Sequence, residues 1–238
     1  MFRIVKAAAT LLTFAAIVGV YQAAAGANGV AIPSAPAPSS GAPTTGGMRT
    51  PEEMAIEVYN SGIAHRDRAL KADTQAMKDK KDSDRLKNEK KAREEHQKAL
   101  KDFTKAASLN PSMPQAYNGM GFSYRKLGDY AKALENYDRA LQLAPNFPDA
   151  IEYRGEAYLA LNRLDDAKQA YLTLFAMDRK QADSRMAAMK TYVAKKKADP
   201  AGVDAAALAA FETWITERTT VAQETRLMAF SAHHGSWR

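Results

Sequence analysis

The sequence predicts an all-α fold: a short solenoid of helical hairpins, with an extended first hairpin and capping helices after the repeats. From about residue 50 the chain is rich in Ala, Leu, Lys, Glu and Gln, which lose little side-chain freedom in a helix. The alternating runs of Val, Ile and Thr that are typical of strands are missing. Small and aromatic residues also recur about 34 positions apart, which is the signature of a helical repeat.

The charge pattern and the lack of cysteine exclude several functional classes. The 34 basic and 27 acidic residues give a net charge of +7, but the two signs are interleaved along the chain. Such mixing argues against a continuous phosphate-binding stripe, and we expect no nucleic-acid partner. With no cysteine, the chain forms no disulfide, thiolate metal site, cysteine nucleophile or lipid attachment through an N-terminal cysteine.

Residues 1–25 have the pattern of a secretory signal peptide. Arg3 and Lys6 precede the apolar run 7–20, and small residues at A-x-A spacing allow cleavage after Ala25 or Ala27. The alternative is an uncleaved inner-membrane anchor that faces the periplasm, although the run spans only about 21 Å of the roughly 30 Å hydrocarbon core. We therefore expect a periplasmic or secreted protein. It would contact a membrane only if the N-terminus were retained uncleaved.

Residues 26–50 are predicted to be a flexible linker. Pro, Ser, Gly, Thr and Ala dominate this segment, and such a composition buries too little apolar surface to offset the entropy lost on ordering. The linker separates the N-terminus from the folded helices.

The clearest repeat covers residues 112–145, and its residue types have a packing reason. Gly121 and Ala133 are small, so two antiparallel helices can approach closely, while aromatic side chains fill the space beside them. Pro145 stops the second helix. The repeat positions are Tyr117, Gly121, Tyr124, Gly128, Ala133, Tyr137, Ala140 and Pro145.

This order of bulky, small and aromatic positions resembles the tetratricopeptide repeat. Adding 34 predicts a second unit over 146–179, with Gly155, Tyr158, Ala167 and Tyr171 at the matching positions. This unit departs from the pattern at two places. Arg154 replaces the usual apolar residue before the glycine, and Arg179 stands in place of the terminating proline, so we expect its second helix to end differently.

An insertion extends the first repeat, residues 51–111. Gly62 precedes Ala99 by 37 residues, whereas 12 separate Gly121 from Ala133. The extra residues predict a long antiparallel arm with its turn near residues 79–84 and a cap at Ser83 or Asp84. Residues 66–102 carry 13 basic and 9 acidic side chains. The arm is either a solvated hairpin held by charge pairs or a docking arm whose few apolar residues complete a coiled coil with a partner.

After the repeats, residues 181–228 read as two further helices that cap the exposed end of the stack, and 229–238 as a flexible tail. Within the whole repeat region, 51–180, no Gly-rich phosphate loop, H-E-x-x-H pair or G-x-S-x-G elbow occurs. Four histidines are present. His65 and His96 with Glu94, Glu95 or Asp67 are a remote metal-site alternative, and His233 and His234 lie in the tail. We expect no enzyme activity, no cofactor and no metal.

The resemblance implies a concave surface, lined by the first helix of each repeat, that holds a peptide or protein segment. The groove positions carried over from the family are Asn118, Phe122, Arg125, Glu152, Glu156, Leu159, Tyr59, Ile63 and Arg66. One unit is basic and the next acidic, so we expect a ligand of mixed charge. The hypothesis is a non-enzymatic scaffold or adaptor of the cell envelope. The alternatives are a self-assembling structural protein that uses residues 66–102 and, remotely, a metal-binding or hydrolytic protein.

Overall fold

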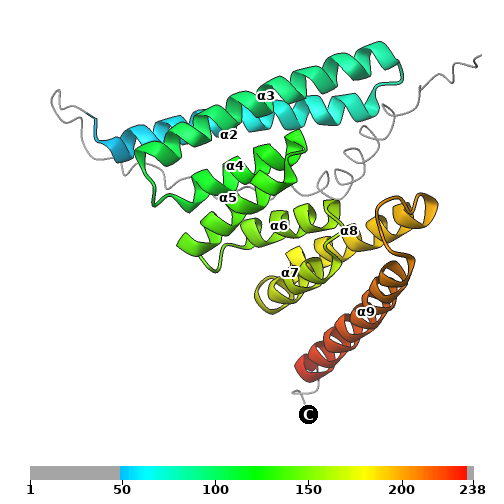
Figure 1. Ribbon diagram of the computed structural model, residues 1–238. Coiled ribbons are helices and arrows are strands. Elements are labelled where there is room, and N and C mark those ends of the chain that lie inside the picture. The colour runs from blue at the N-terminus through cyan, green and yellow to red at the C-terminus, as the bar shows by residue number, and fades with distance from the viewer. Residues whose placement is uncertain (1–48, 235–238) are drawn as a thin grey trace, which may run out of the picture. The chain divides into compact units, whose positions relative to one another are not determined.

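The computed structural model describes residues 49–234, with side chains described through residue 225 (Figure 1). This part of the chain forms eight helices and no strand, which confirms the predicted all-α class. The expected signal peptide and nearly all of the expected linker lie outside the described residues. None of the described helices combines the length and the apolar character needed to cross a membrane. The helices are α2 (Pro51–Lys78), α3 (Asp82–Leu109), α4 (Pro114–Leu127), α5 (Tyr130–Leu143), α6 (Pro148–Ala160), α7 (Leu164–Met177), α8 (Arg179–Ala198) and α9 (Ala205–His234).

The chain divides into two compact units between Asp129 and Tyr130. The first unit contains α2, α3 and α4, and the second contains α5 to α9. The division falls between the two helices of the central repeat. The expected contact between Gly121 and Ala133 therefore stays a prediction.

The extended first hairpin is confirmed, since α2 and α3 are 28 residues long each. Thr50 begins α2 with a capping box: its hydroxyl accepts the backbone N–H of Glu53, and the Glu53 carboxylate accepts that of Thr50. The turn lies at residues 79–81, as predicted. The predicted cap at Ser83 or Asp84 is wrong, because α3 begins at Asp82 and no side chain caps it.

Small residues seven positions apart form the seam between these two long helices. All of them are buried, and a strict seven-residue spacing keeps one face of each helix turned to the other. Small side chains let the two backbones approach closely. Large apolar residues are few in the arm, and they alone do not indicate this seam. Its members are Ala55, Gly62, Ala69 and Ala76 on α2, and Ala92, Ala99 and Ala106 on α3.

At the base of the hairpin one large ring replaces the alanine contacts. Phe103 of α3 is fully buried, with its centroid 5.5 Å from that of Tyr59. A Cβ atom at Gly62 of α2 would lie 2.7 Å from the Phe103 ring, and one at Gly119 of α4 would lie 2.8 Å away. The ring is thus wedged against two glycine backbones, which ties the three helices of the first unit together.

In the second unit, two sharp turns position α7 and α8. Asn162 follows α6 with a left-handed φ of 57°, the conformation that Gly128 adopts after α4 with a φ of 89°. Asn162 also receives a hydrogen bond from the Tyr192 hydroxyl (2.8 Å) and donates one to the Gly202 carbonyl (2.7 Å). Asp178 separates α7 from α8 without a proline and caps α8 by accepting the Gln181 N–H at 3.0 Å.

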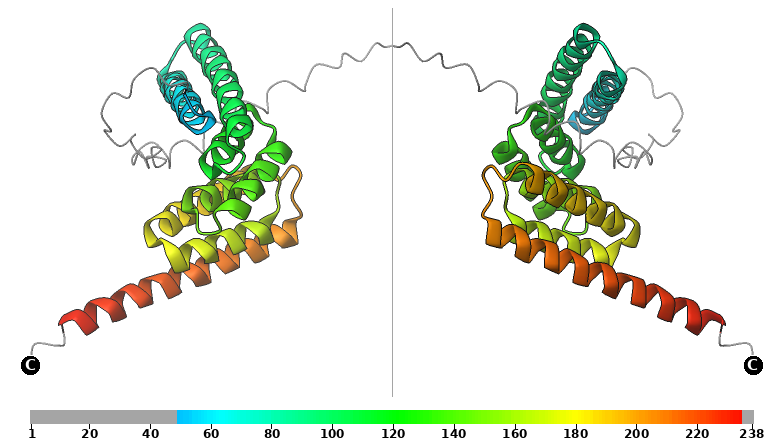
Figure 2. Two further views of the ribbon diagram at one scale, coloured as in Figure 1. Left: turned by 90° about the vertical axis from the view of Figure 1, so that its left-hand side faces the viewer. Right: turned by 90° about the vertical axis from the view of Figure 1, so that its right-hand side faces the viewer.

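A chain of aromatic contacts joins α7, α8 and α9. Neighbouring ring centroids along this chain are 5.5 to 6.3 Å apart. Figure 2 shows α9 running along the other helices of its unit and continuing past them to His234, beyond the predicted helix end at residue 228. The rings in order are Tyr192, Phe211, Trp214, Tyr171 and Phe175.

Candidate functional site

Most of the predicted repeat positions are buried, as the packing of a helical hairpin requires. The small residues and most of the aromatic ones are buried, whereas Tyr117 and Tyr124 are half-buried and Pro145 is exposed just after α5. Gly128 supplies the left-handed residue that ends α4. The buried members are Gly121, Ala133, Tyr137, Ala140, Gly155, Tyr158, Ala167 and Tyr171.

The predicted groove residues of α4 lie mostly inside the protein. Asn118 is fully buried and Phe122 is only 4 % exposed, while Arg125 is half-buried. The Arg125 guanidinium lies 5.1 Å and the Lys126 ammonium 5.8 Å from the centre of the Phe122 ring. This face of α4 therefore presents positive charge over an aromatic ring.

A buried charge cluster joins this face of α4 to the long hairpin. Asp73 of α2 lies 3.3 Å from His96 of α3 and 3.6 Å from the Lys126 ammonium. Burial raises the pKa of Asp73, but the His96 hydrogen bond and the Lys126 charge outweigh it, so the pKa lies below its ordinary value. Burial lowers the pKa of His96 and outweighs the effect of Asp73. His96 is therefore neutral at pH 7.

The predicted groove residues of α2 also contribute to the core. Tyr59 is fully buried, and Ile63 packs against the same hydrophobic cluster while staying partly exposed. Arg66 is 9 % exposed and donates two hydrogen bonds to the Asp67 carboxylate, at 3.0 and 2.7 Å. Of these three predicted groove residues, only Ile63 is therefore partly accessible to a ligand.

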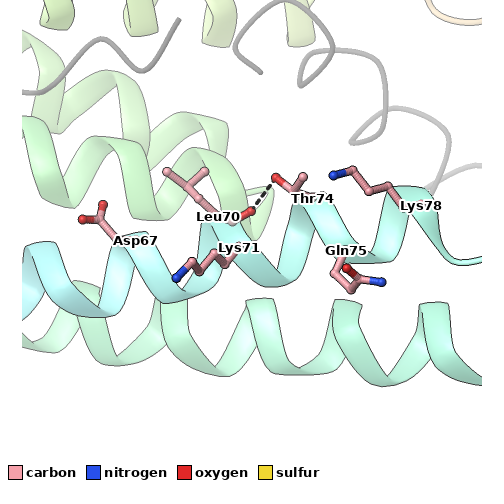
Figure 3. Close-up of a pocket in the computed structure, with 6 residues that line it drawn as sticks. All are labelled: Asp67, Leu70, Lys71, Thr74, Gln75 and Lys78. Atoms are coloured by element: carbon pink, nitrogen blue, oxygen red, sulfur yellow. Dashed lines mark hydrogen bonds between the residues drawn. The ribbon is translucent and has the colours of Figure 1, made fainter. Parts of the chain in front are cut away.

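Further along α2, the same face opens into a shallow pocket of about 450 Å3 (Figure 3). Ile63, Asp67, Leu70 and Thr74 follow one another at three- or four-residue spacing, so they share one face of the helix. The last three of these line the pocket, which lies within the inserted part of the arm. Among the described residues, those that line the pocket come from α2: Asp67, Leu70, Lys71, Thr74, Gln75 and Lys78.

This pocket was not predicted, because the groove positions that the family resemblance implies on α2 end at Arg66. The signal was present in the spacing. Continuing the first-helix positions in steps of three or four residues would have reached Leu70 and Thr74.

In the second unit, α8 covers the predicted acidic positions of α6. The Arg185 guanidinium is 1 % exposed and its Nη2 atom lies 3.5 Å from Glu152 and 3.4 Å from Glu156. Leu159 is fully buried. The two glutamates keep 14 % and 11 % of their side chains exposed, so their charge is partly neutralised by Arg185 at the surface.

Arg185 is a residue that the repeat spacing could have found. Adding 34 to Ile151 gives Arg185, and adding 34 to Tyr158 gives Tyr192. The first helix of the repeat thus has a counterpart in α8. A Cβ atom at Gly155 would lie 3.2 Å from the Ala170 Cβ and 3.4 Å from the Arg185 Nε, which explains why this position is small.

The two histidines of the arm bind different carboxylates. His65 contacts Glu95 at 2.7 Å, whereas His96 contacts Asp73. The hydrogen bond from Lys98, with others from His65 and Arg68, lowers the pKa of Glu95 to about 2. Between residues 49 and 225 no group of three or more His, Asp or Glu side chains is placed to hold a metal ion.

The outer part of the arm exposes few large apolar side chains. Met77 is 44 % and Leu86 59 % exposed, while Leu70 and Leu100 are half-buried. The alanine seam is already buried between the two helices of the hairpin. Self-assembly through residues 66–102 stays a prediction.

Comparisons with known proteins point to one family. The family model described as tetratricopeptide repeat matches residues 114–147, within two residues of the predicted central repeat. No curated protein sequence matches the chain.

Several solved structures are similar to this chain, each at 19 % identity. The second TPR domain of human RPAP3, in complex with an HSP70 peptide, has a TM-score of 0.44 and covers 59 % of this chain and 98 % of its own. The first TPR of Spaghetti (RPAP3), bound to an HSP90 peptide, has a TM-score of 0.45 with coverages of 62 % and 99 %. For the first TPR domain of human RPAP3 the TM-score is 0.46, with coverages of 62 % and 98 %.

Proposed function

Because residues 114–147 match the tetratricopeptide repeat, we propose that this chain is a non-enzymatic scaffold or adaptor of the cell envelope. Its first helices hold a segment of another polypeptide. The first helices are those of the hairpins, α2, α4 and α6, and they carry all the predicted groove residues.

The observation that carries this proposal is the pocket on α2. It continues the first-helix face beyond Ile63 and has a volume of about 450 Å3. Leu70 is half-buried and is the one apolar side chain among the described lining residues, an arrangement that suits a single apolar anchor of a bound segment. The Thr74 hydroxyl is bonded to the Leu70 carbonyl at 2.8 Å (Figure 3).

The charges around the pocket favour a ligand of mixed sign. Lys71 and Lys78 flank the pocket with Asp67, and Arg125 adds positive charge on α4. In the second unit the carboxylates of Glu152 and Glu156 share one buried arginine. We expect a segment with both acidic and basic residues, bound with modest affinity through several small contacts.

The envelope location rests on the sequence of residues 1–25, which has a basic start, an apolar run and small residues before Ala25. Intact-mass measurement of the protein from its native host tests it. A mature chain that begins after Ala25 or Ala27 is expected. A full-length chain that fractionates with the cytoplasm would contradict the location.

Two matched leucine variants test the binding face. Leu70→Ala removes the apolar side chain of the pocket, and Leu86→Ala removes an exposed one elsewhere on the arm. Tagged protein is used to capture the partner from envelope extracts. The partner is expected to be lost from Leu70→Ala and retained by Leu86→Ala. Equal retention by both variants would contradict the proposal. Circular dichroism at the capture temperature establishes that both variants are folded.

A further inference from the structure

One face of α3 carries a row of lysines along most of the helix. At about 100° per residue, the positions in this row fall within an arc of about 100°. All of them are exposed, and the opposite face carries the buried residues Ala92, His96 and Phe103. The row consists of Lys87, Lys90, Lys91, Lys98, Lys101 and Lys105, with Glu94 as its one acidic member.

Most of this positive charge is not neutralised by the protein. Lys98 donates to Glu95 at 2.6 Å, and Lys90 lies 4.0 Å from Glu94. The other four lysines of the row, which are Lys87, Lys91, Lys101 and Lys105, have no carboxylate within ion-pair distance among residues 49–225. The row therefore presents a net positive surface.

The acids that alternate with these lysines in the sequence lie on other faces of the helix. Glu89 is 3.7 Å from Arg85, and Asp102 accepts a hydrogen bond from Ser61 of α2 at 2.7 Å. The interleaving of charges along the sequence was the argument against a continuous basic stripe. Helical geometry sorts the two signs onto different faces, so that argument does not hold for α3.

We infer that the lysine row is a docking surface for an anionic phospholipid bilayer. The row runs straight for about 27 Å, at about 1.5 Å per residue over the positions from Lys87 to Lys105. A straight row of flexible ammonium groups fits a flat surface that offers phosphates along its whole length. Lysines close to such a surface are attracted to it electrostatically.

The composition of the row separates a bilayer from other anionic partners. No apolar or aromatic residue lies within it, whereas protein interfaces are anchored by aromatic and arginine side chains and are depleted in lysine. Single-stranded nucleic acid is bound through aromatic rings that stack on its bases, and the row has no such ring. Lysine rather than arginine also indicates a diffuse charge interaction without fixed bidentate geometry.

Vesicle flotation with the full chain tests this inference. Vesicles of phosphatidylcholine report binding that does not depend on charge, and vesicles that also contain phosphatidylglycerol report the charge-dependent part. The test variant replaces Lys87, Lys91, Lys101 and Lys105 with Gln. The control variant replaces Lys80, Lys81, Lys180 and Lys190 with Gln, which removes the same charge from exposed positions outside both the row and the pocket. Glutamine is a good helix former, so the test variant keeps α3 intact.

The wild type is expected to bind the phosphatidylglycerol vesicles, with binding that weakens as salt is added. With about 1 kcal/mol for each of the four lysines at the surface, the test variant should lose roughly a thousandfold in its partition coefficient. The control variant should lose less than tenfold. Equal losses in the two variants, or no loss in the test variant, would overturn the inference. Tighter binding of the wild type to duplex DNA than to vesicles at equal phosphate concentration would also overturn it.

Discussion

The first and last hairpins of this protein are both antiparallel helix pairs, but different side chains hold them together. In α2 and α3 the seam is made of alanine and glycine, and large rings occur only at its base, where Phe103 meets Tyr59. In α8 and α9 the contact is made by large aromatic rings such as Tyr192 and Phe211, which also reach α7. Helix pairs of one architecture are thus held together by side chains of very different size.

The difference shows how an arm can be long without a large apolar core. Alanine buries little area per residue, so close backbone approach supplies van der Waals contact that large side chains supply elsewhere. The outer faces are then free to carry charge. In the second unit the rings bury more area but leave fewer positions for charged residues in the contact. This contrast predicts that substitutions in the two regions have different consequences.

The largest expected effect is loss of the ring at the base of the arm. Phe103→Ala removes the side chain that fills the space between the backbones of Gly62 and Gly119, and should cost about 3 to 5 kcal/mol of unfolding free energy. Phe211→Ala is the matched change in the second unit. Hydrogen exchange should show faster opening of residues 49–129 in the first variant and of α8 and α9 in the second. Loss of protection in the same region for both would contradict the comparison.

A smaller effect is expected from crowding the alanine seam. Ala99→Leu adds a branched side chain where α2 and α3 touch, and overpacking should cost about 1 to 3 kcal/mol. Ala209→Leu on the exposed face of α9 is the control and should change stability by less than about 0.5 kcal/mol. Chemical denaturation measures both. Equal midpoints would show that the seam is not tightly packed.

Acid should weaken the first unit in particular. The pKa of His96 is lower in the folded protein than its ordinary value of 6.5, so the unfolded chain binds more protons near that pH. Its contribution to stability is therefore full above pH 6.5 and is lost as the pH falls toward the folded pKa. Denaturation at pH 7.5 and at pH 5.5 should show this loss, and His96→Leu should reduce it. An unchanged pH dependence in that variant would assign the effect to other groups.

The smallest effect is expected at the surface of the arm. Arg85 lies 2.9 Å from Asp82 and 3.7 Å from Glu89, and all three side chains are largely exposed. Arg85→Ala should therefore cost only about 0.2 to 0.5 kcal/mol, and less at high salt. Melting curves at low and high salt measure this. A loss comparable to that of Ala99→Leu would mean that charge pairs, and not the alanine seam, hold the arm together.

The sequence predicted the helices well because the repeat pattern is dominated by local rules. Small residues, aromatic positions and the turn at Gly128 recur at fixed spacing, so the hairpins and the extended first hairpin could be derived. The burial of the α4 face could not, because the long arm brings Asp73 and His96 against Lys126. That contact is non-local, and nothing in the sequence around Lys126 indicates it.

The candidate site was partly missed for a similar reason. Family positions end at Arg66, whereas the open surface begins beside it, in an insertion that the repeat pattern does not describe. The lysine row of α3 was obscured by counting charges along the chain rather than around the helix. Arg185 was within reach, since one more step of 34 from Ile151 leads to it.

Photo-crosslinking in living cells tests the central claim, that the first-helix face of α2 holds a polypeptide partner, most directly. Thr74 lies in the pocket and Thr104 on the exposed side of α3, and each hydroxyl bonds the carbonyl four residues earlier at 2.8 Å. One variant carries a photoreactive residue at position 74 and a second variant carries it at position 104, so that two similar sites on one arm are compared. A discrete crosslinked protein is expected from position 74 and not from position 104. The same adduct from both positions, or an adduct from position 104 only, would contradict the claim.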